Sequence, residues 1–142
     1  PAGEWARSSG LDVRVVEPGG DYVAALVGAE LVVLAGFTRK LPDDVLRAHP
    51  GRVINVHPSL LPRHGGPGMW GRRVHEAVLA AGDAESGCTV HRVTSEYDEG
   101  EILEVRRCPV RPDDTAESLA ARVLSLEHEA LPAAVRRMLS LP

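Results

Sequence analysis

The sequence predicts an α/β fold, with a three-layer architecture around an open and mostly parallel sheet. Short apolar runs alternate with amphipathic stretches along the chain, which is the pattern of successive strand, helix and strand units. The run 31–35 is apolar at every position, as expected for a parallel strand that helices cover on both faces. With 142 residues, the chain has the length of one domain with a sizeable core.

Local patterns assign the elements of the first half of the chain. Asp21 suits the position that caps a helix, because its side chain can accept a hydrogen bond from the first turn. Pro42 suits the first turn of another helix, where a backbone N–H would have no partner. We expect helices over 2–9, 21–28 and 42–48, and strands over 13–16, 31–36 and 52–56.

A loop over 57–69 divides the chain, because three Pro and three Gly in this segment disfavour regular structure. Beyond it, apolar residues at helical spacing and a terminating Gly82 predict a helix. The expected elements are a helix over 70–81, strands over 88–93 and 102–105 around a loop over 94–101, and an amphipathic helix from Thr115 toward residue 139 with a kink at Pro132.

Composition and charge exclude several classes of partner. A net charge of -4 and an isoelectric point near 5.9 provide no positive field that would attract nucleic acid or an anionic membrane. The longest apolar run, 31–35, is too short to cross a bilayer. Small molecules are therefore the expected partners, and the oligomeric state is left open.

Cysteine and histidine usage bears on the compartment and on metals. Cys88 and Cys108 form neither a CxxC motif nor a dense framework, which favours a reducing compartment and hence the cytoplasm. No HExxH motif, paired cysteines or close histidine spacing indicates a metal site, so no metal is expected. We interpret four further histidines as scattered surface residues: His64, His75, His91 and His128.

The residues most informative about function are Asn55, His57 and Asp98. Successive side chains of a strand point to opposite faces, so Asn55 and His57 should project together from one side of their strand. Pro58 ends the strand because it has no backbone N–H to donate. The pair is thus expected at the carboxyl end of a strand, where open α/β sheets bind ligands, with Asp98 completing the site from a later loop.

An amide, an imidazole and a carboxylate around one carbonyl carbon can catalyse acyl transfer. Asn55 can donate to an oxygen that becomes negative, and His57 as an imidazolium can stabilise that oxygen and protonate a leaving nitrogen. Asp98 would favour the protonated imidazole, directly or through an ordered water. Pro58 lies between His57 and Ser59, which argues against a serine nucleophile, so direct transfer between bound substrates is expected.

Five ordered motifs resemble those of the folate-dependent formyltransferase family. The first is Ile-Asn-Val-His-Pro-Ser-Leu-Leu-Pro at 54–62, which resembles the family signature. The others resemble the branch that formylates glycinamide ribonucleotide and lie at 34–41, 87–91, 93–100 and 122–132. The resemblance covers roughly residues 4 to 142, and it is specific because several short patterns coincide in order and spacing.

The resemblance implies a Rossmann-like formyltransferase fold and the transfer of a formyl group from 10-formyltetrahydrofolate to the amine of glycinamide ribonucleotide, in purine biosynthesis. It implies Asn55 and Asp98 as catalytic residues and His57 as the proton donor. Pro58 and Glu127 would face the ribonucleotide. The residues implied for folate binding are Thr38, Arg39, Lys40, Leu41, Asn55, Thr94, Ser95, Glu96 and Tyr97.

Other interpretations stay open at this point. Arg39 and Lys40 could form only a polar turn, and Glu127 could lie on a solvated helix face near Glu129. Water in place of the amine would make the protein a formyltetrahydrofolate hydrolase. A methionyl-tRNA formyltransferase is disfavoured, because that class usually has Arg-Gly-Ala-Ala-Pro where this chain has 63–71. A catalytically silent folate-binding domain is the remaining alternative.

The first strand and the glycine-rich phosphate loop of the family have no counterpart in this sequence. Gly19 and Gly20 precede no strand, loop and helix arrangement, so we interpret them as a turn. We therefore expect residues 1–142 to be a formyltransferase catalytic domain that lacks the N-terminal βαβ part of a longer protein. Without that first strand, strand 31–36 would keep one unpaired backbone edge.

Overall fold

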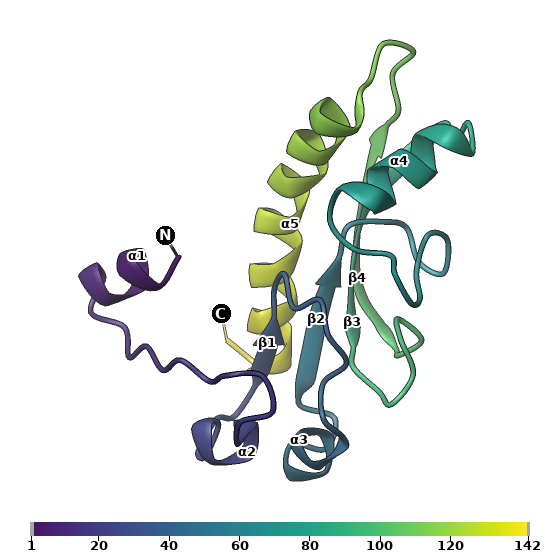
Figure 1. Ribbon diagram of the computed structural model, residues 1–142. Helices are drawn as coiled ribbons and strands as arrows, with labels where there is room; N and C mark the ends of the chain where they lie inside the picture. Colours follow the sequence, from purple (N-terminus) through teal and green to yellow (C-terminus); the bar gives the residue numbers. More distant parts are fainter. Residues whose placement is uncertain (1, 142) are drawn as a thin grey trace.

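The computed structural model describes residues 2–141, which form four strands and five helices (Figure 1). In chain order the elements are α1 (Ala2–Ser8), α2 (Tyr22–Ala25), β1 (Val32–Leu34), α3 (Asp43–Ala48), β2 (Val53–His57), α4 (Arg72–Ala80), β3 (Glu85–Arg92), β4 (Ile102–Pro109) and α5 (Ala116–Met138). The predicted α/β class and the open sheet are confirmed.

The described strands form one sheet in the order β1, β2, β3, β4. β1 and β2 are parallel, whereas β2 with β3 and β3 with β4 are antiparallel. The described sheet is therefore mixed rather than mostly parallel. A helix does join β2 to β3, which is why the sequence pattern resembles a parallel crossover, but β3 returns in the opposite direction. The short connection over 93–101 allows only antiparallel pairing between β3 and β4.

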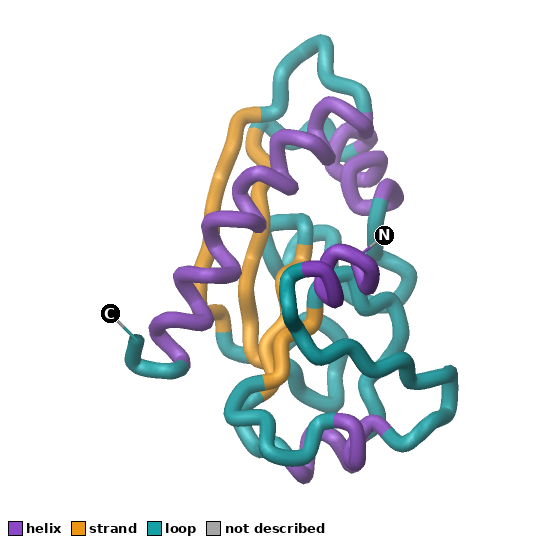
Figure 2. The backbone as a smooth tube through the Cα atoms, turned by 90° about the vertical axis from the view of Figure 1, so that its left-hand side faces the viewer, coloured by secondary structure: helices purple, strands orange, loops and turns teal. Residues whose placement is uncertain are grey.

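Two apolar clusters share the residues of β2. Ile54 and Val56 belong to the larger cluster, which also contains buried side chains of β3, β4 and α5. Val53 belongs to a smaller cluster with residues of β1, α2 and α3. Figure 2 shows α5 running along the strands. Because Asn55 and His57 alternate with Ile54 and Val56, they project from the face opposite to α5.

α5 begins where the sequence predicts and continues through Pro132 to Met138. Thr115 caps the helix: Ser118 N–H donates to Thr115 Oγ1 at 3.2 Å, and Thr115 N–H donates to Ser118 Oγ at 3.0 Å. Pro132 is exposed, so the carbonyl group that loses its helical partner can face water. The buried residues recur at helical spacing: Leu119, Val123, Ala130 and Ala134.

Two expectations for the first half of the chain are wrong. Residues 13–16 form no strand, since none of the strands described within 2–141 pairs with them. β1 is not covered on both faces, because it is the edge strand of the described sheet and Val33 is 39% exposed. One backbone edge of β1 has no pairing strand in the described sheet.

The remaining boundaries differ by a few residues from those predicted. α2 is shorter than expected, although Asp21 does cap it by accepting a hydrogen bond from the Ala24 N–H at 2.8 Å. β3 and β4 are longer than expected, because their antiparallel ladder extends to the pair of Glu85 and Pro109. Within residues 2–141, no helix is both long enough and apolar enough to cross a membrane.

Candidate active site

A pocket of about 630 Å³ opens at the carboxyl end of β2. Its walls come from the segment after β1, the end of β2, the loop before α4, the loop between β3 and β4, and the first half of α5. A pocket of this volume suits small organic molecules. It lies where the sequence predicts a ligand site, at the carboxyl end of a strand.

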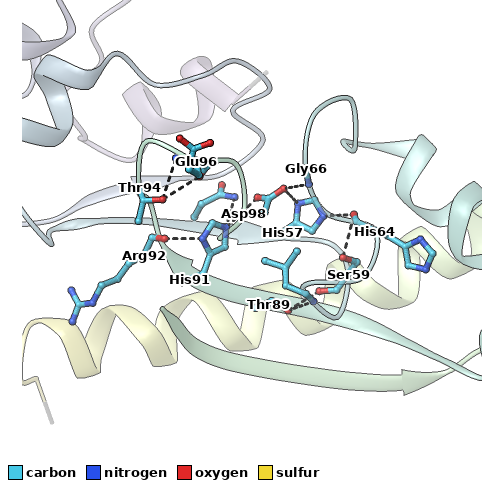
Figure 3. A network of polar contacts seen from close by, with 12 residues as sticks. His57, Ser59, His64, Gly66, Thr89, His91, Arg92, Thr94, Glu96 and Asp98 are labelled. Atoms are coloured by element: carbon cyan, nitrogen blue, oxygen red, sulfur yellow. Dashed lines mark hydrogen bonds and ion pairs between the residues drawn. The ribbon is translucent and has the colours of Figure 1, made fainter. Parts of the chain in front are cut away.

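The structure brings Asn55, His57 and Asp98 together at this pocket. Nδ1 of His57 lies 3.6 Å from Oδ2 of Asp98, which belongs to the loop between β3 and β4 (Figure 3). Asn55 and Asp98 are linked by a fourth residue, whose ring nitrogen contacts both side chains. The predicted convergence is therefore present as geometry, and the catalytic roles stay predictions.

The fourth residue is His91, which the sequence interpretation wrongly placed among the surface histidines. His91 is only 2% exposed and lies opposite Asn55 in the antiparallel pair of β3 and β2. Its Nε2 is 3.2 Å from Asn55 Nδ2 and 3.3 Å from Asp98 Oδ1, while its Nδ1 donates to the Arg92 carbonyl at 2.8 Å. His91 is the last residue of the motif 87–91. Recognising that the strand of this motif pairs antiparallel with β2 would have placed His91 opposite Asn55.

Asp98 has a left-handed backbone, and its carboxylate is held by the loop before α4. Its φ of +55° lies in the left-handed region, and the Gly66 N–H donates to its Oδ2 at 2.9 Å. Burial pushes the pKa of Asp98 upward, but contact with His91, the Gly66 N–H and the nearby His57 outweigh burial, so the pKa lies below its ordinary value. Asp98 is therefore a carboxylate at neutral pH.

His57 is 4% exposed, and both of its ring nitrogens face polar partners. A carbonyl oxygen can only accept, so Nε2 donates its hydrogen to the His64 carbonyl at 2.8 Å. Burial lowers the pKa of His57 below its ordinary value, and the His64 carbonyl and Asp98 offset this only in part. Asp98 raises the pKa of His57, as the sequence argument expects, but burial has the larger effect and the net pKa is lowered. Nδ1 faces the Asp98 carboxylate at 3.6 Å.

The loop after β2 is fastened to β3 by Thr89. The Thr89 hydroxyl donates to the Ser59 carbonyl at 2.7 Å and accepts from the Leu61 N–H at 3.1 Å. The Ser59 hydroxyl itself donates to the Arg63 carbonyl at 2.7 Å. Ser59 is fully buried and engaged with the loop backbone, which agrees with the sequence argument against a serine nucleophile.

All residues that the family resemblance assigns to folate binding line the pocket. They form two groups, one in the segment after β1 and one in the loop between β3 and β4. Arg39 and Lys40 are exposed at the rim, so the polar-turn interpretation still applies to them alongside binding. The residues are Thr38, Arg39, Lys40, Leu41, Asn55, Thr94, Ser95, Glu96 and Tyr97.

Pro58 and Glu127, assigned to the ribonucleotide side, also line the pocket. Glu127 projects from α5 and is partly buried, so it does not lie on a fully solvated helix face. Burial raises the pKa of Glu127, and the neighbouring His128 offsets this only in part. Glu127 thus places an acidic group with a raised pKa on the α5 side of the pocket.

Two more histidines were wrongly interpreted as surface residues. His75 of α4 is 4% exposed, lines the pocket and has an Nδ1 without a hydrogen-bond partner in the described structure. His64 is partly buried, and its Nε2 lies 2.8 Å from Asp83 Oδ2. Among residues 2–141, no group of three or more acidic, His or Cys side chains is arranged to hold a metal ion.

Comparison with known proteins agrees with this geometry. A family model described as formyl transferase matches residues 14–135. The chloroplastic phosphoribosylglycinamide formyltransferase of Vigna unguiculata is 44% identical over 137 residues, which cover 89% of this chain and 44% of that protein. This chain thus spans less than half the length of that relative.

Solved structures agree in fold as well as in sequence. Glycinamide ribonucleotide transformylase 1 from Symbiobacterium toebii superposes with a TM-score of 0.86 at 36% identity, covering 94% of this chain and 66% of that chain. A formyltetrahydrofolate deformylase from Pseudomonas syringae superposes with a TM-score of 0.80 at 27% identity, covering 94% and 46%. The family model spans most of the chain, and the polar residues of the motifs found in the sequence meet at one pocket. This protein therefore belongs to the formyl transferase family.

Proposed function

We propose that this chain carries the catalytic site of an enzyme that transfers a formyl group from 10-formyltetrahydrofolate to the amine of glycinamide ribonucleotide. The observation that carries the proposal is the convergence of Asn55, His57 and Asp98 on one pocket. Family membership and the names of the similar proteins support this choice of substrates. Residues 1–142 are then the catalytic part, and both substrates are small molecules.

The reaction begins when the neutral amine attacks the formyl carbon, which places a negative charge on the formyl oxygen. The Asn55 amide group has two N–H bonds, and His91 Nε2 engages Nδ2 at 3.2 Å. The second N–H is then available to donate to the developing oxyanion. One such donor contributes about 10²–10³ in rate. His91 holds the amide so that this donor is preorganised.

The collapse of the tetrahedral intermediate breaks the bond between the formyl carbon and the folate nitrogen. The attacking amine loses one proton and the leaving nitrogen gains one, so the site only needs to move a proton between them. Asp98 is ionised and can accept the amine proton, directly or through a water. His57 Nδ1 faces Asp98 at 3.6 Å and can pass a proton onward to the leaving nitrogen. The carboxylate and the imidazole return to their starting forms.

The low pKa of His57 suits a proton carrier rather than a permanent cation. A neutral His57 can accept a proton at Nδ1, and the neighbouring Asp98 carboxylate favours that protonated form. The folate-side residues of two loops and the ribonucleotide-side residues Pro58 and Glu127 would hold the substrates in line on the same pocket.

The test is a formyl-transfer assay on purified protein with both substrates. We expect N-formylated ribonucleotide and tetrahydrofolate in equal amounts, with turnover strongly reduced by Asn55→Ala and by Asp98→Asn. Formyl transfer that persists unchanged in both variants would contradict the assigned site. Binding of a folate analogue without turnover would instead support the silent folate-binding domain.

Hydrolysis of 10-formyltetrahydrofolate is the second candidate, favoured by the structural similarity to the Pseudomonas syringae deformylase. In that reaction water takes the place of the amine at the same three residues. Formate release measured without any amine acceptor distinguishes the two. Release as fast as formyl transfer would make the hydrolase the better assignment.

A further inference from the structure

His64 links His57 to the buried carboxylate of Asp83. The backbone carbonyl of His64 contacts His57, and its ring contacts Asp83. Its backbone carbonyl accepts the hydrogen of His57 Nε2 at 2.8 Å and lies 3.4 Å from the hydroxyl of Ser59 (Figure 3). Its ring Nε2 lies 2.8 Å from Oδ2 of Asp83. The side chains of His64 and Asp83 are 14% and 8% exposed, so this contact is largely shielded from water.

The backbone of His64 adopts a conformation that residues with a Cβ seldom take. Its φ is +54°, in the left-handed region, which is unfavourable for a non-glycine residue. Such a conformation persists only where the surrounding contacts hold it. The ring contact to Asp83 ties the His64 side chain to the segment that follows α4.

Asp83 is a firm anchor because it closes the C-terminal end of α4. Its N–H donates to the Val78 carbonyl at 3.3 Å, and the preceding Gly82 N–H donates to the Leu79 carbonyl at 3.1 Å. The exposed Arg63 also contacts the Asp83 carboxylate from the solvent side. The loop that carries His64 is therefore attached to the end of a packed helix.

We propose that Asp83 and His64 are positioning residues that fix the tautomer and the orientation of His57, an inference that rests on the proposed catalytic role of His57. Asp83 holds the His64 ring, the ring holds the left-handed backbone, and that backbone aims the carbonyl at His57 Nε2. With Nε2 committed to the carbonyl, every proton that His57 exchanges is on Nδ1, beside Asp98.

Loss of the anchor releases this arrangement in a defined way. Without the ring contact, the peptide after His64 can rotate out of the left-handed region, and its carbonyl leaves His57 Nε2 without an acceptor. A neutral His57 then gains by placing its hydrogen on Nδ1, where the Asp98 carboxylate can accept it. Nδ1 in that tautomer has no lone pair for a transferred proton, so proton exchange with a substrate fails.

The experiment reads the tautomer of His57 directly from ¹⁵N chemical shifts of its ring nitrogens, at a pH where the ring is neutral. Wild-type protein should show a hydrogen on Nε2 and none on Nδ1. Asp83→Ala and His64→Ala should shift the population toward Nδ1–H and lower kcat by about 10²-fold. The matched control is Arg63→Gln, which removes the exposed partner of Asp83 and should leave the His57 shifts unchanged.

A rescue variant separates positioning from simple loss of structure. His64→Gly removes the ring but adopts positive φ without strain, so it should recover the wild-type tautomer and most of the turnover lost in His64→Ala. Wild-type ¹⁵N shifts in both Asp83→Ala and His64→Ala would overturn the proposal, as would His64→Gly behaving like His64→Ala. If the wild-type protein transfers no formyl group, the tautomer measurement still decides the positioning role, so the two failures are distinguishable.

Discussion

Asn55 and His91 lie directly opposite each other on antiparallel strands, with Nδ2 of the amide 3.2 Å from Nε2 of the ring. His91 also stands 3.3 Å from the Asp98 carboxylate, so one buried ring spaces the two polar groups that flank the pocket. Its Nδ1 hydrogen goes to the Arg92 carbonyl, so Nε2 is the ring atom that faces both the Asn55 amide and the Asp98 carboxylate.

Replacing His91 should therefore disable the proposed oxyanion donor. We expect His91→Ala to lower kcat by about 10²-fold, because the Asn55 amide and the Asp98 carboxylate both lose a fixed partner. Stability should fall by about 1–3 kcal/mol, the range for leaving a buried polar group unpaired. Steady-state kinetics and urea denaturation measure the two effects. His128→Ala, at an exposed position on α5, is the control, and equal kinetics in both variants would refute the role of His91.

Removing only the charge of Asp98 should separate its electrostatic role from its packing. Asp98→Asn keeps the volume and can still accept the Gly66 N–H, so the fold should be retained. Turnover should fall by about 10²-fold or more, since no carboxylate remains to take the amine proton. The pKa of His57 should also move further down, because the Asp98 charge now raises it. An NMR titration of His57 and a turnover assay check both statements, and wild-type turnover would refute the assignment.

The buried rings of His57 and His75 should make the fold sensitive to acid. Burial is the main cause that lowers the pKa of each ring below its ordinary value of about 6.5. The unfolded chain then binds protons that the folded protein does not, so the free energy of unfolding falls as the pH drops below about 6.5. Above that pH both rings are neutral in either state, and neither contributes a slope.

Urea denaturation at a series of pH values measures this dependence. His75→Gln should flatten the decline in stability below pH of about 6.5, because one of the two buried rings no longer titrates. Asp98 also makes the free energy of unfolding fall as the pH drops, because its pKa is lowered in the folded protein. Its effect appears at lower pH, near the ordinary pKa range of carboxyl groups. An unchanged slope in His75→Gln would show that its burial does not control its protonation.

Gly65 lets the loop before α4 approach the proposed catalytic carboxylate. A Cβ at this position would lie 2.6 Å from Leu61 Cδ2 and 3.3 Å from Asp98 Cβ. The tip of Leu61 can move aside, but Asp98 would have to shift by a few tenths of an ångström. We expect Gly65→Ala to lower kcat by about tenfold or more while costing about 1–3 kcal/mol in stability. Gly3→Ala, which meets only ordinary contacts, is the control, and equal kinetics would show that Asp98 tolerates the shift.

The sequence was sufficient to predict the local placement of Asn55 and His57. Alternation along a strand is a property of the backbone, and the packing of Ile54 and Val56 against the α5 side leaves the other face free for the polar pair. The position of Asp98 needed more, because it depends on the register of β3 with β4 and on contact with Gly66. The sequence indicated Asp98 as a carboxylate on a later loop, and the family resemblance supported that choice.

His91 and His64 show what sequence patterns could not supply. His91 becomes part of the site only because β3 runs antiparallel to β2, whereas the helix between them favoured a parallel interpretation. His64 depends on a left-handed backbone and a side-chain partner beyond α4, neither of which has a periodic signal. Similarly, 13–16 has the composition of a strand but no neighbouring strand within the described chain.

The division of β2 between two unequal clusters has a consequence for how the pocket admits large ligands. Leu41 and Phe37, from the wall after β1, pack in the smaller cluster, whereas the strands that carry His57 and His91 are secured by the larger one. Subglobal opening should therefore begin at that wall, with amide hydrogens of β1 and α3 exchanging faster than those of β3 and α5. The wall after β1 can then open locally while His57 and His91 keep their positions relative to each other.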